Sequence, residues 1–219
     1  MQVCGLMTML KQMPKNIDAG KFGNHGFSLA EVLIVIFIIL LIAAIGIPNL
    51  MTMVGEMRTA GDARDLNGAI VLAKMRASSD FARARVYFDL SANTFRVEVF
   101  QSGAANWKND GCPNSCTGDQ LLSTGVSFGY GTLTTPPTGV ATLTQAPLCL
   151  KDDLVSTYPN TACIMFNSRG IPISSSWVAT PSDAIYVTDG RLVTGVTVSA
   201  TGLTKVWRTE ASGANWKQK

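Results

Sequence analysis

The feature that most constrains this chain is an apolar run from Phe27 to Ile47. As an α-helix, its 21 residues would be about 31 Å long, which is enough to cross the hydrocarbon core of a bilayer. Helices of soluble proteins have an apolar stripe and a polar face, whereas this run is apolar on nearly every side. The run therefore predicts a membrane-spanning helix.

Residues 1–26, which precede the run, carry three lysines and one aspartate. Such a basic flank favours the cytoplasmic side of a membrane. An ordinary secretory signal peptide has the same order of segments, and Gly46 would end a small-residue cleavage site for it. That alternative fits less well, because the apolar core of a signal peptide has about 7 to 15 residues and a charge inside it opposes its purpose.

The run contains one carboxylate, Glu31, and no lysine, arginine or histidine to pair with it. Because a carboxylate in a bilayer costs on the order of a few kcal/mol, it is a functional-site hypothesis by default. Cleavage between Gly26 and Phe27 would supply the missing cation, a new α-amine four residues before Glu31. This amine could pair with Glu31 of the same molecule or of a neighbour packed alongside.

The segment "GFSLAEV" at 26–32, followed by an apolar helix, resembles the cleavage motif of type IV prepilins and type II secretion pseudopilins. The resemblance implies that a prepilin peptidase removes residues 1–26 and that Phe27 is N-methylated. It also implies a filament in which Glu31 pairs with the N-terminal amine of a neighbouring pilin. Pro48 lies where these proteins often kink the helix. The expected location is the inner membrane, single-pass, with the C-terminal domain in the periplasm or on the cell surface.

Beyond the spanning segment, which we place at 27–48, apolar residues keep a helical spacing. The pattern predicts an amphipathic continuation of the helix over 49–85, packed against the protein's own sheet. Three glycines in this half each cost up to about 1 kcal/mol relative to alanine, so it should be less rigid than its length suggests. The expected apolar stripe is Leu50, Met53, Val54, Met57, Ala63, Leu66, Ile70, Ala73 and Ala77, and the expected polar face is Glu56, Arg58, Asp62, Arg64, Asp65 and Lys74.

Residues 86–219 have the two-residue period of strands and form the predicted extracytoplasmic domain. The pattern predicts a hairpin that turns at 91–93, a strand over 163–173 and a meander whose first turn is Asp189-Gly190. Residues 101–160 are rich in loop signals. A long N-terminal helix packed on an antiparallel β-sheet is an α+β architecture, and the resemblance implies that it is pilin-like.

Three segments, "LNGAIVLAKMRASSDFARARVYFD", "FNSRGIPI" and "VSATGLTKVW", resemble the GspH/FimT family of minor pilins and pseudopilins. The resemblance implies two sheets, a late glycine-centred turn, and a minor subunit that primes or caps a type IV pilus or a type II secretion pseudopilus. Some members in type IV pilus systems bind DNA through a late Gly-Arg-x-Arg motif. The matching positions here are Gly202, Leu203, Thr204 and Lys205, so the first arginine is lost and the second is replaced by lysine.

The C-terminal 29 residues carry five cations against one carboxylate, with two tryptophans interleaved. Basic residues beside aromatic ones can hold nucleic acid through phosphate contacts and base stacking, although they are more often a solvated tail. A DNA-binding pilin that uses Lys205 and Arg208 is therefore one alternative, and a major pilin is another. The five cations are Arg191, Lys205, Arg208, Lys217 and Lys219.

Four cysteines remain after Cys4 leaves with the leader. An even number of cysteines outside the inner membrane predicts disulfides, for which three pairings are possible. We favour Cys112 with Cys116 and Cys149 with Cys163, because each pair closes a short loop.

The histidine content argues against an enzyme, because the only histidine, His25, lies in the leader. We find no nucleophile with a base, no metal-ligand cluster and no phosphate-binding loop. The sequence therefore predicts no enzyme, no metal and no cofactor.

Overall fold

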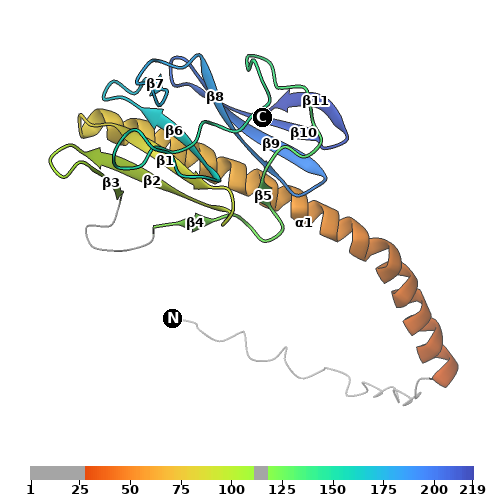
Figure 1. The fold of residues 1–219 in the computed structure, drawn as a ribbon. Helices are drawn as coiled ribbons and strands as arrows, with labels where there is room; N and C mark the ends of the chain where they lie inside the picture. The colour runs from red at the N-terminus through yellow and green to blue at the C-terminus, as the bar shows by residue number, and fades with distance from the viewer. Residues whose placement is uncertain (1–27, 111–117) are drawn as a thin grey trace, which may run out of the picture. The chain divides into compact units, whose positions relative to one another are not determined.

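The computed structural model describes residues 28–110 and 118–219. Contacts divide the chain into two units, residues 1–46 and residues 47–219. Within the described residues the chain forms one long helix, α1 (Leu29–Ser79), followed by eleven β-strands (Figure 1). The expected α+β class, a long N-terminal helix packed on antiparallel strands, is confirmed.

The first part of α1 is the predicted apolar helix. Ser28 begins it as an N-cap residue, because its Oγ accepts from the Ala30 amide at 3.3 Å and its carbonyl accepts from the amide of Glu31. The helix is long and apolar enough to cross a membrane, and no side chain in its most apolar stretch is buried. It continues without interruption through Pro48, the expected kink position.

The helix ends six residues earlier than expected, at Ser79 instead of residue 85, and β1 (Ala84–Asp89) begins two residues before 86. The cause is a C-terminal cap around Phe81, which has a left-handed backbone with φ 49°. The amide of Ala82 donates to the Ala77 carbonyl at 3.2 Å, as in a Schellman motif. Glycine usually marks such a cap, so the sequence contained no signal for it.

The later part of the predicted stripe is buried, and its earlier part is not. Leu50, Met53, Val54 and Met57 are 43–68% exposed, because they lie on the side of α1 opposite Thr59, which faces the sheets. Asp62, expected on the polar face, is also buried. Its carboxylate accepts from the amide and hydroxyl of Ser123, at 3.1 and 2.8 Å. The buried residues of α1 are Thr59, Asp62, Ala63, Leu66, Ala69, Ile70, Ala73 and Ala77.

The strands form two antiparallel sheets, as the resemblance implied, although the strand pattern by itself suggested one. Sheet A has the order β3-β2-β1-β6-β7, with β4 also pairing with β2, and sheet B has the order β11-β10-β9-β8-β5. The remaining strands of sheet A are β2 (Thr94–Gln101), β3 (Asn106–Asn109), β4 (Gln120–Leu121), β6 (Thr161–Phe166) and β7 (Pro172–Ile173). Those of sheet B are β5 (Ser127–Phe128), β8 (Ser182–Thr188), β9 (Leu192–Ser199), β10 (Thr204–Glu210) and β11 (Gly213–Gln218).

Two predicted turns are present, between β1 and β2 and at Asp189-Gly190, but the strand expected over 163–173 is interrupted. Residues 167–171 form a tight turn in which the Asn167 side chain accepts from two backbone amides. Gly170 has φ 71° in this turn, a conformation that glycine adopts readily. The segment therefore becomes two paired strands, β6 and β7.

The main core lies between α1 and the inner faces of both sheets. A smaller cluster covers the outer face of each sheet, and both clusters draw on the loop-rich segment 101–160. Leu133 and Leu143 pack on sheet B, while Cys149 and Leu150 pack on sheet A. The long loop is therefore a covering layer for both sheets.

The sequence nearly repeats itself in "SGAANWK" at 102–108 and "SGANWK" at 212–217, and the fold gives these segments matching positions. Each forms an edge strand, β3 in sheet A and β11 in sheet B. Trp107 packs against Phe100, with ring centroids 5.1 Å apart, and Trp216 packs against Tyr186 at 5.9 Å. Each repeat thus places a tryptophan in the outer layer of its own sheet.

Sheet B offers a test of this packing at Gly195. A Cβ there would lie 2.5 Å from two ring carbons of the buried Tyr186. We expect Gly195→Ala to lower the free energy of unfolding by about 1–3 kcal/mol, because the ring would have to move within a filled core. The matched control is Gly213→Ala, where nothing lies within 4 Å of the added Cβ. Equal unfolding midpoints for the two variants in chemical denaturation would contradict the packing.

Candidate functional site

Glu31 lies in the first turn of α1 and is exposed. Negative charge is favoured near a helix N-terminus, so the position itself is compatible with a carboxylate. Among the ion pairs of the described residues none involves Glu31, and the first basic residue after it is Arg58. Gly26 and Phe27, the expected cleavage position, lie outside the described residues. Glu31 is therefore an acid on an apolar helix that lacks a cationic partner within this part of the chain.

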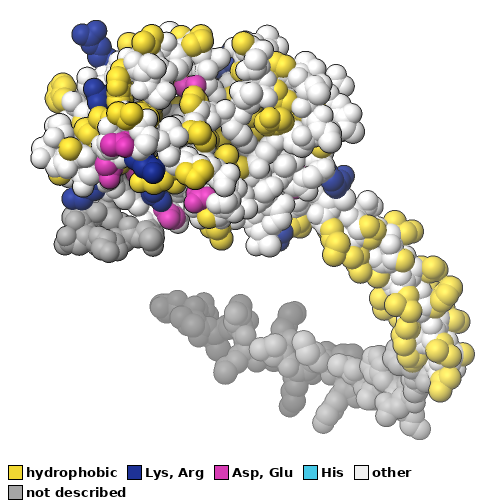
Figure 2. All heavy atoms as spheres, in the orientation of Figure 1, with side chains coloured by type: hydrophobic (Ala, Val, Ile, Leu, Met, Phe, Trp, Pro, Cys, Tyr) yellow, Lys and Arg dark blue, Asp and Glu magenta, His cyan; other side chains and the backbone are white. Residues whose placement is uncertain are grey.

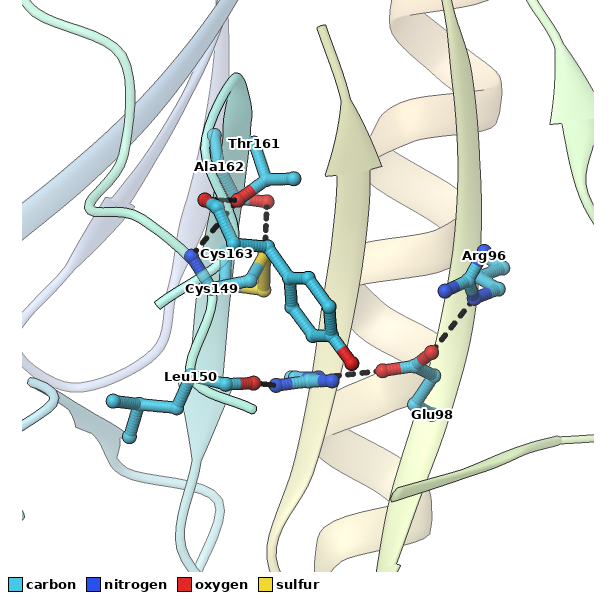
Figure 3. Close-up of a disulfide and its surroundings, with 9 residues drawn as sticks. Arg96, Glu98, Cys149, Leu150, Thr161, Ala162 and Cys163 are labelled. Atoms are coloured by element: carbon cyan, nitrogen blue, oxygen red, sulfur yellow. Dashed lines mark hydrogen bonds and ion pairs between the residues drawn. A yellow bond between two sulfur atoms is a disulfide. The ribbon is translucent and has the colours of Figure 1, made fainter. Parts of the chain in front are cut away.

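A disulfide joins Cys149 to Cys163, with an S–S distance of 1.99 Å and Cα atoms 4.9 Å apart. It is the pairing that we favoured for these two cysteines. Cys112 and Cys116 lie outside the described residues. Cys149 belongs to the loop-rich segment 101–160 that covers sheet A, here called the covering segment, and Cys163 belongs to β6. The bond therefore fastens the covering segment to β6, in the outer cluster of sheet A (Figure 3).

A buried group of charges lies beside this disulfide, on the outer face of sheet A (Figure 3). Arg85 is only 2% exposed and donates to the Glu98 carboxylate and to the Leu150 carbonyl, each at 2.5 Å. Glu98 also accepts from Arg96 at 2.7 Å, and Arg96 in turn pairs with Asp119 at 3.1 Å. The covering segment thus contributes a carbonyl to a buried arginine.

Aromatic rings complete the surroundings of Arg85. Its guanidinium carbon lies 3.9 Å from the centroid of the Trp107 ring and 5.6 Å from that of Tyr87. Burial lowers the pKa of Arg85, and the attraction of Glu98 opposes that shift. Burial also raises the pKa of the Tyr87 hydroxyl. Because every charge is matched by a nearby partner, the group is suited to holding the covering layer in place.

Sequence reasoning missed this group of charges. The available signal was the alternation in "ARVYFD" and "FRVEVF", which puts Arg85 and Tyr87 on one face of β1, and Arg96 and Glu98 on one face of β2. The register of β1 with β2 places Arg85 opposite Glu98. That register depends on where the hairpin turns. Predicting the pair of Arg85 and Glu98 therefore required the position of the turn as well as the alternation.

The residues considered for nucleic acid are not brought together. Lys205 and Arg208 are an odd number of positions apart on β10, so they point to opposite faces of sheet B. Arg208 pairs with Glu56 at 2.6 Å, and the Lys205 ammonium lies 6.0 Å from the Trp207 ring centroid. Gly202, the centre of the late turn, is buried beneath Lys74.

Among residues 28–110 and 118–219, no group of three or more His, Cys, Asp or Glu side chains is placed to hold a metal ion.

Replacing Glu98 tests the buried charges. We expect Glu98→Gln to destabilise the fold by about 3–5 kcal/mol, because it leaves the buried Arg85 without its anionic partner. Asp119→Asn is the matched control, since Asp119 is exposed and surface ion pairs contribute about 0–1 kcal/mol. Chemical denaturation of both variants measures the difference. A loss below about 1 kcal/mol for Glu98→Gln would contradict the role given to this pair.

A comparison with known protein families finds a match in the N-terminal region of the chain. Residues 21–47 match the prokaryotic N-terminal methylation motif. No curated protein sequence matches the chain.

Two solved structures of the minor pseudopilin EpsH from the type II secretion system of Vibrio cholerae resemble this structure. One has a TM-score of 0.42 and 14% identity, and covers 70% of this chain and 94% of its own. The other has a TM-score of 0.34 and 12% identity, and covers 74% and 96%. The matched N-methylation motif thus overlaps, from Leu29 onward, a helix of membrane-spanning length.

Proposed function

We propose that this chain is a minor pilin or pseudopilin, a structural subunit of a type IV pilus or of a type II secretion pseudopilus. The observation that carries the proposal is Glu31, an acid without a cationic partner on an otherwise apolar helix, placed within the matched methylation motif. An isolated carboxylate in a bilayer is costly, so a partner is needed. A neighbouring subunit with a free N-terminal amine supplies one.

Processing creates that amine. In this proposal a prepilin peptidase cleaves between Gly26 and Phe27, residues 1–26 are lost, and Phe27 is methylated. Residues 27–48 then span the inner membrane, and residues 49–219 lie in the periplasm or on the cell surface. The disulfide between Cys149 and Cys163 is consistent with an oxidising compartment of this kind.

A second feature that supports subunit packing is the exposed stripe at the start of the second unit. Its apolar side chains lie on the side of α1 opposite Thr59, which faces the sheets. Gly61 and Gly68 continue the stripe, and nothing lies within 4 Å of a Cβ added at either position. Another helix could therefore approach closely along this face. The exposed side chains are Leu50, Met53, Val54 and Met57.

The alternative of a DNA-binding pilin receives less support. Lys205 and Arg208 point to opposite faces of β10, and Arg208 is paired with Glu56. A structural subunit accounts for Glu31 and for the exposed helix face without a nucleic-acid ligand.

Replacement of Glu31 tests the proposal. Glu31→Ala would leave the amine of a neighbouring subunit uncompensated in the bilayer, which costs about 3–5 kcal/mol and lowers the assembly constant by about a hundredfold or more. We expect the variant to be processed, folded and retained in the membrane, but to lose co-purification with other pilins from membrane extracts. Val32→Ala, one residue along the same turn, is the matched control and should assemble normally. Normal co-purification of the Glu31→Ala variant would refute the pairing.

A further inference from the structure

The proposed filament contacts use α1, whose exposed hydrophobic side chains are yellow in Figure 2. They give no task to the near-repeat of "SGAANWK" and "SGANWK", whose two copies form the edge strands β3 and β11. An edge strand presents a row of backbone amides and carbonyls that its own sheet does not use. The two copies of the repeat differ in what these outward groups meet.

In the first copy the outward amide belongs to Trp107, and it is capped. The amide of Asp110 donates to the Val97 carbonyl of β2 at 2.8 Å, so the backbone groups of Asp110 and of Lys108 face β2. Those of Trp107 therefore face away from β2. The Trp107 amide donates to the Asp152 carboxylate at 3.0 Å. The covering segment thus closes this edge with an acid.

In the second copy the matching residue is Trp216, and its outward amide has no such acceptor. The Lys219 amide donates to the Val206 carbonyl of β10 at 3.0 Å, so the backbone groups of Lys219 and Lys217 face β10. Those of Trp216 and Gln218 face away. β11 has no second neighbouring strand, and no acceptor within the described chain receives these two amides. The edge of sheet B is therefore open where the edge of sheet A is closed.

Two lysines alternate with these free groups along β11. Lys217 and Lys219 are exposed and take part in none of the ion pairs of the described residues. Their face of β11 borders an open groove of about 690 Å³, in which the exposed carboxylate of Glu210 lies at the other end, opposite Gly213. Directly opposed residues of paired strands carry their side chains on the same face. A strand added to β11 would therefore place alternate side chains beside the two lysines, where carboxylates are favoured.

We propose that β11 binds an extended acidic segment of a partner protein by strand addition. The partner's main chain bonds to the free groups of β11, and its alternate carboxylates lie beside the two lysines. In strand addition the main-chain hydrogen bonds give affinity and the alternate side chains give specificity. The first copy of the repeat supports an acid at this place, because Asp152 already supplies one to the matching amide. A second β11 would instead bring lysine opposite lysine, which is destabilising. The contact goes beyond the proposed filament role and does not depend on Glu31.

The test measures hydrogen exchange at single amides of the full-length protein in detergent micelles. The probe is a short peptide with blocked ends in which glutamate and valine alternate. At saturating peptide we expect the amides of Trp216 and Gln218 to exchange about tenfold more slowly, because they become hydrogen-bonded. The Lys217 amide, which already faces β10, should slow much less and is the internal control.

Modified peptides separate strand addition from simple charge attraction. Valine is the residue that would lie opposite Trp216 and Gln218, so N-methyl groups on the valine amides should abolish the protection. N-methyl groups on the glutamate amides would point away from β11 and should be tolerated. A peptide with lysine in place of glutamate keeps the main chain but should not bind, because it opposes the charge of the edge.

Variants of the protein test the same two parts of the contact. We expect Lys217→Gln to weaken binding of the acidic peptide about two- to fivefold, as the loss of one exposed charge pair does. Lys108→Gln, at the matching lysine of the first copy, is the control and should leave binding unchanged. Gln218→Pro removes one outward amide without removing a ladder bond to β10, and it should abolish binding while the sheet stays folded.

Three outcomes would overturn the proposal. Unchanged exchange at Trp216 and Gln218 with the acidic peptide at millimolar concentration would refute strand addition. Equal protection by the lysine peptide would refute an acidic partner. Protection of the same two amides that grows with protein concentration in the absence of peptide would assign the edge to a second copy of this chain.

Discussion

The rest of the structure depends on an apolar helix that the chain does not bury. The most apolar stretch of α1 has no buried side chain, and it carries one acid without a cationic partner in the described chain. Such a helix is stable only in a medium other than water, and its acid is stable there only beside a cation. A membrane meets the first requirement, and a neighbouring subunit with a free amine meets the second. The two requirements together favour a subunit that moves from a bilayer into a filament.

The domain that follows is fastened to the same helix by polar contacts as well as by its core. Asp62 binds Ser123, Glu56 binds Arg208, and Lys74 binds the turn at Gly202. These contacts lie between residues 56 and 74 of α1, so the sheets are held in a fixed register on this part of the helix. The opposite side of α1 remains uncovered at Leu50, Met53, Val54 and Met57 and leaves an apolar face available. The helix can therefore serve the core of the domain and external partners at once, with different faces.

The long elements could be predicted from the sequence because their periods are strong. The apolar run, the buried positions of α1 from Ala63 onward and the Asp189-Gly190 turn all follow from residue spacing. The helix end could not be predicted, because Phe81 occupies a left-handed position that usually takes glycine. The exposure of Leu50, in contrast, follows from spacing, because nine residues of helix place it on the side opposite Thr59; the predicted stripe had joined two faces of α1. The buried pair of Arg85 and Glu98 depends on strand register, which spacing alone does not determine.

The most direct test of the account is the N-terminus of the protein extracted from the membranes of cells that express it. Intact mass and N-terminal sequencing should show a chain that begins at Phe27 and carries one added methyl group. A chain that begins immediately after Gly46 would make the apolar run an ordinary signal peptide and would remove Glu31 from the mature protein. A chain that still begins at Met1 would lack the new amine, and the explanation given for the acid in the helix would be wrong.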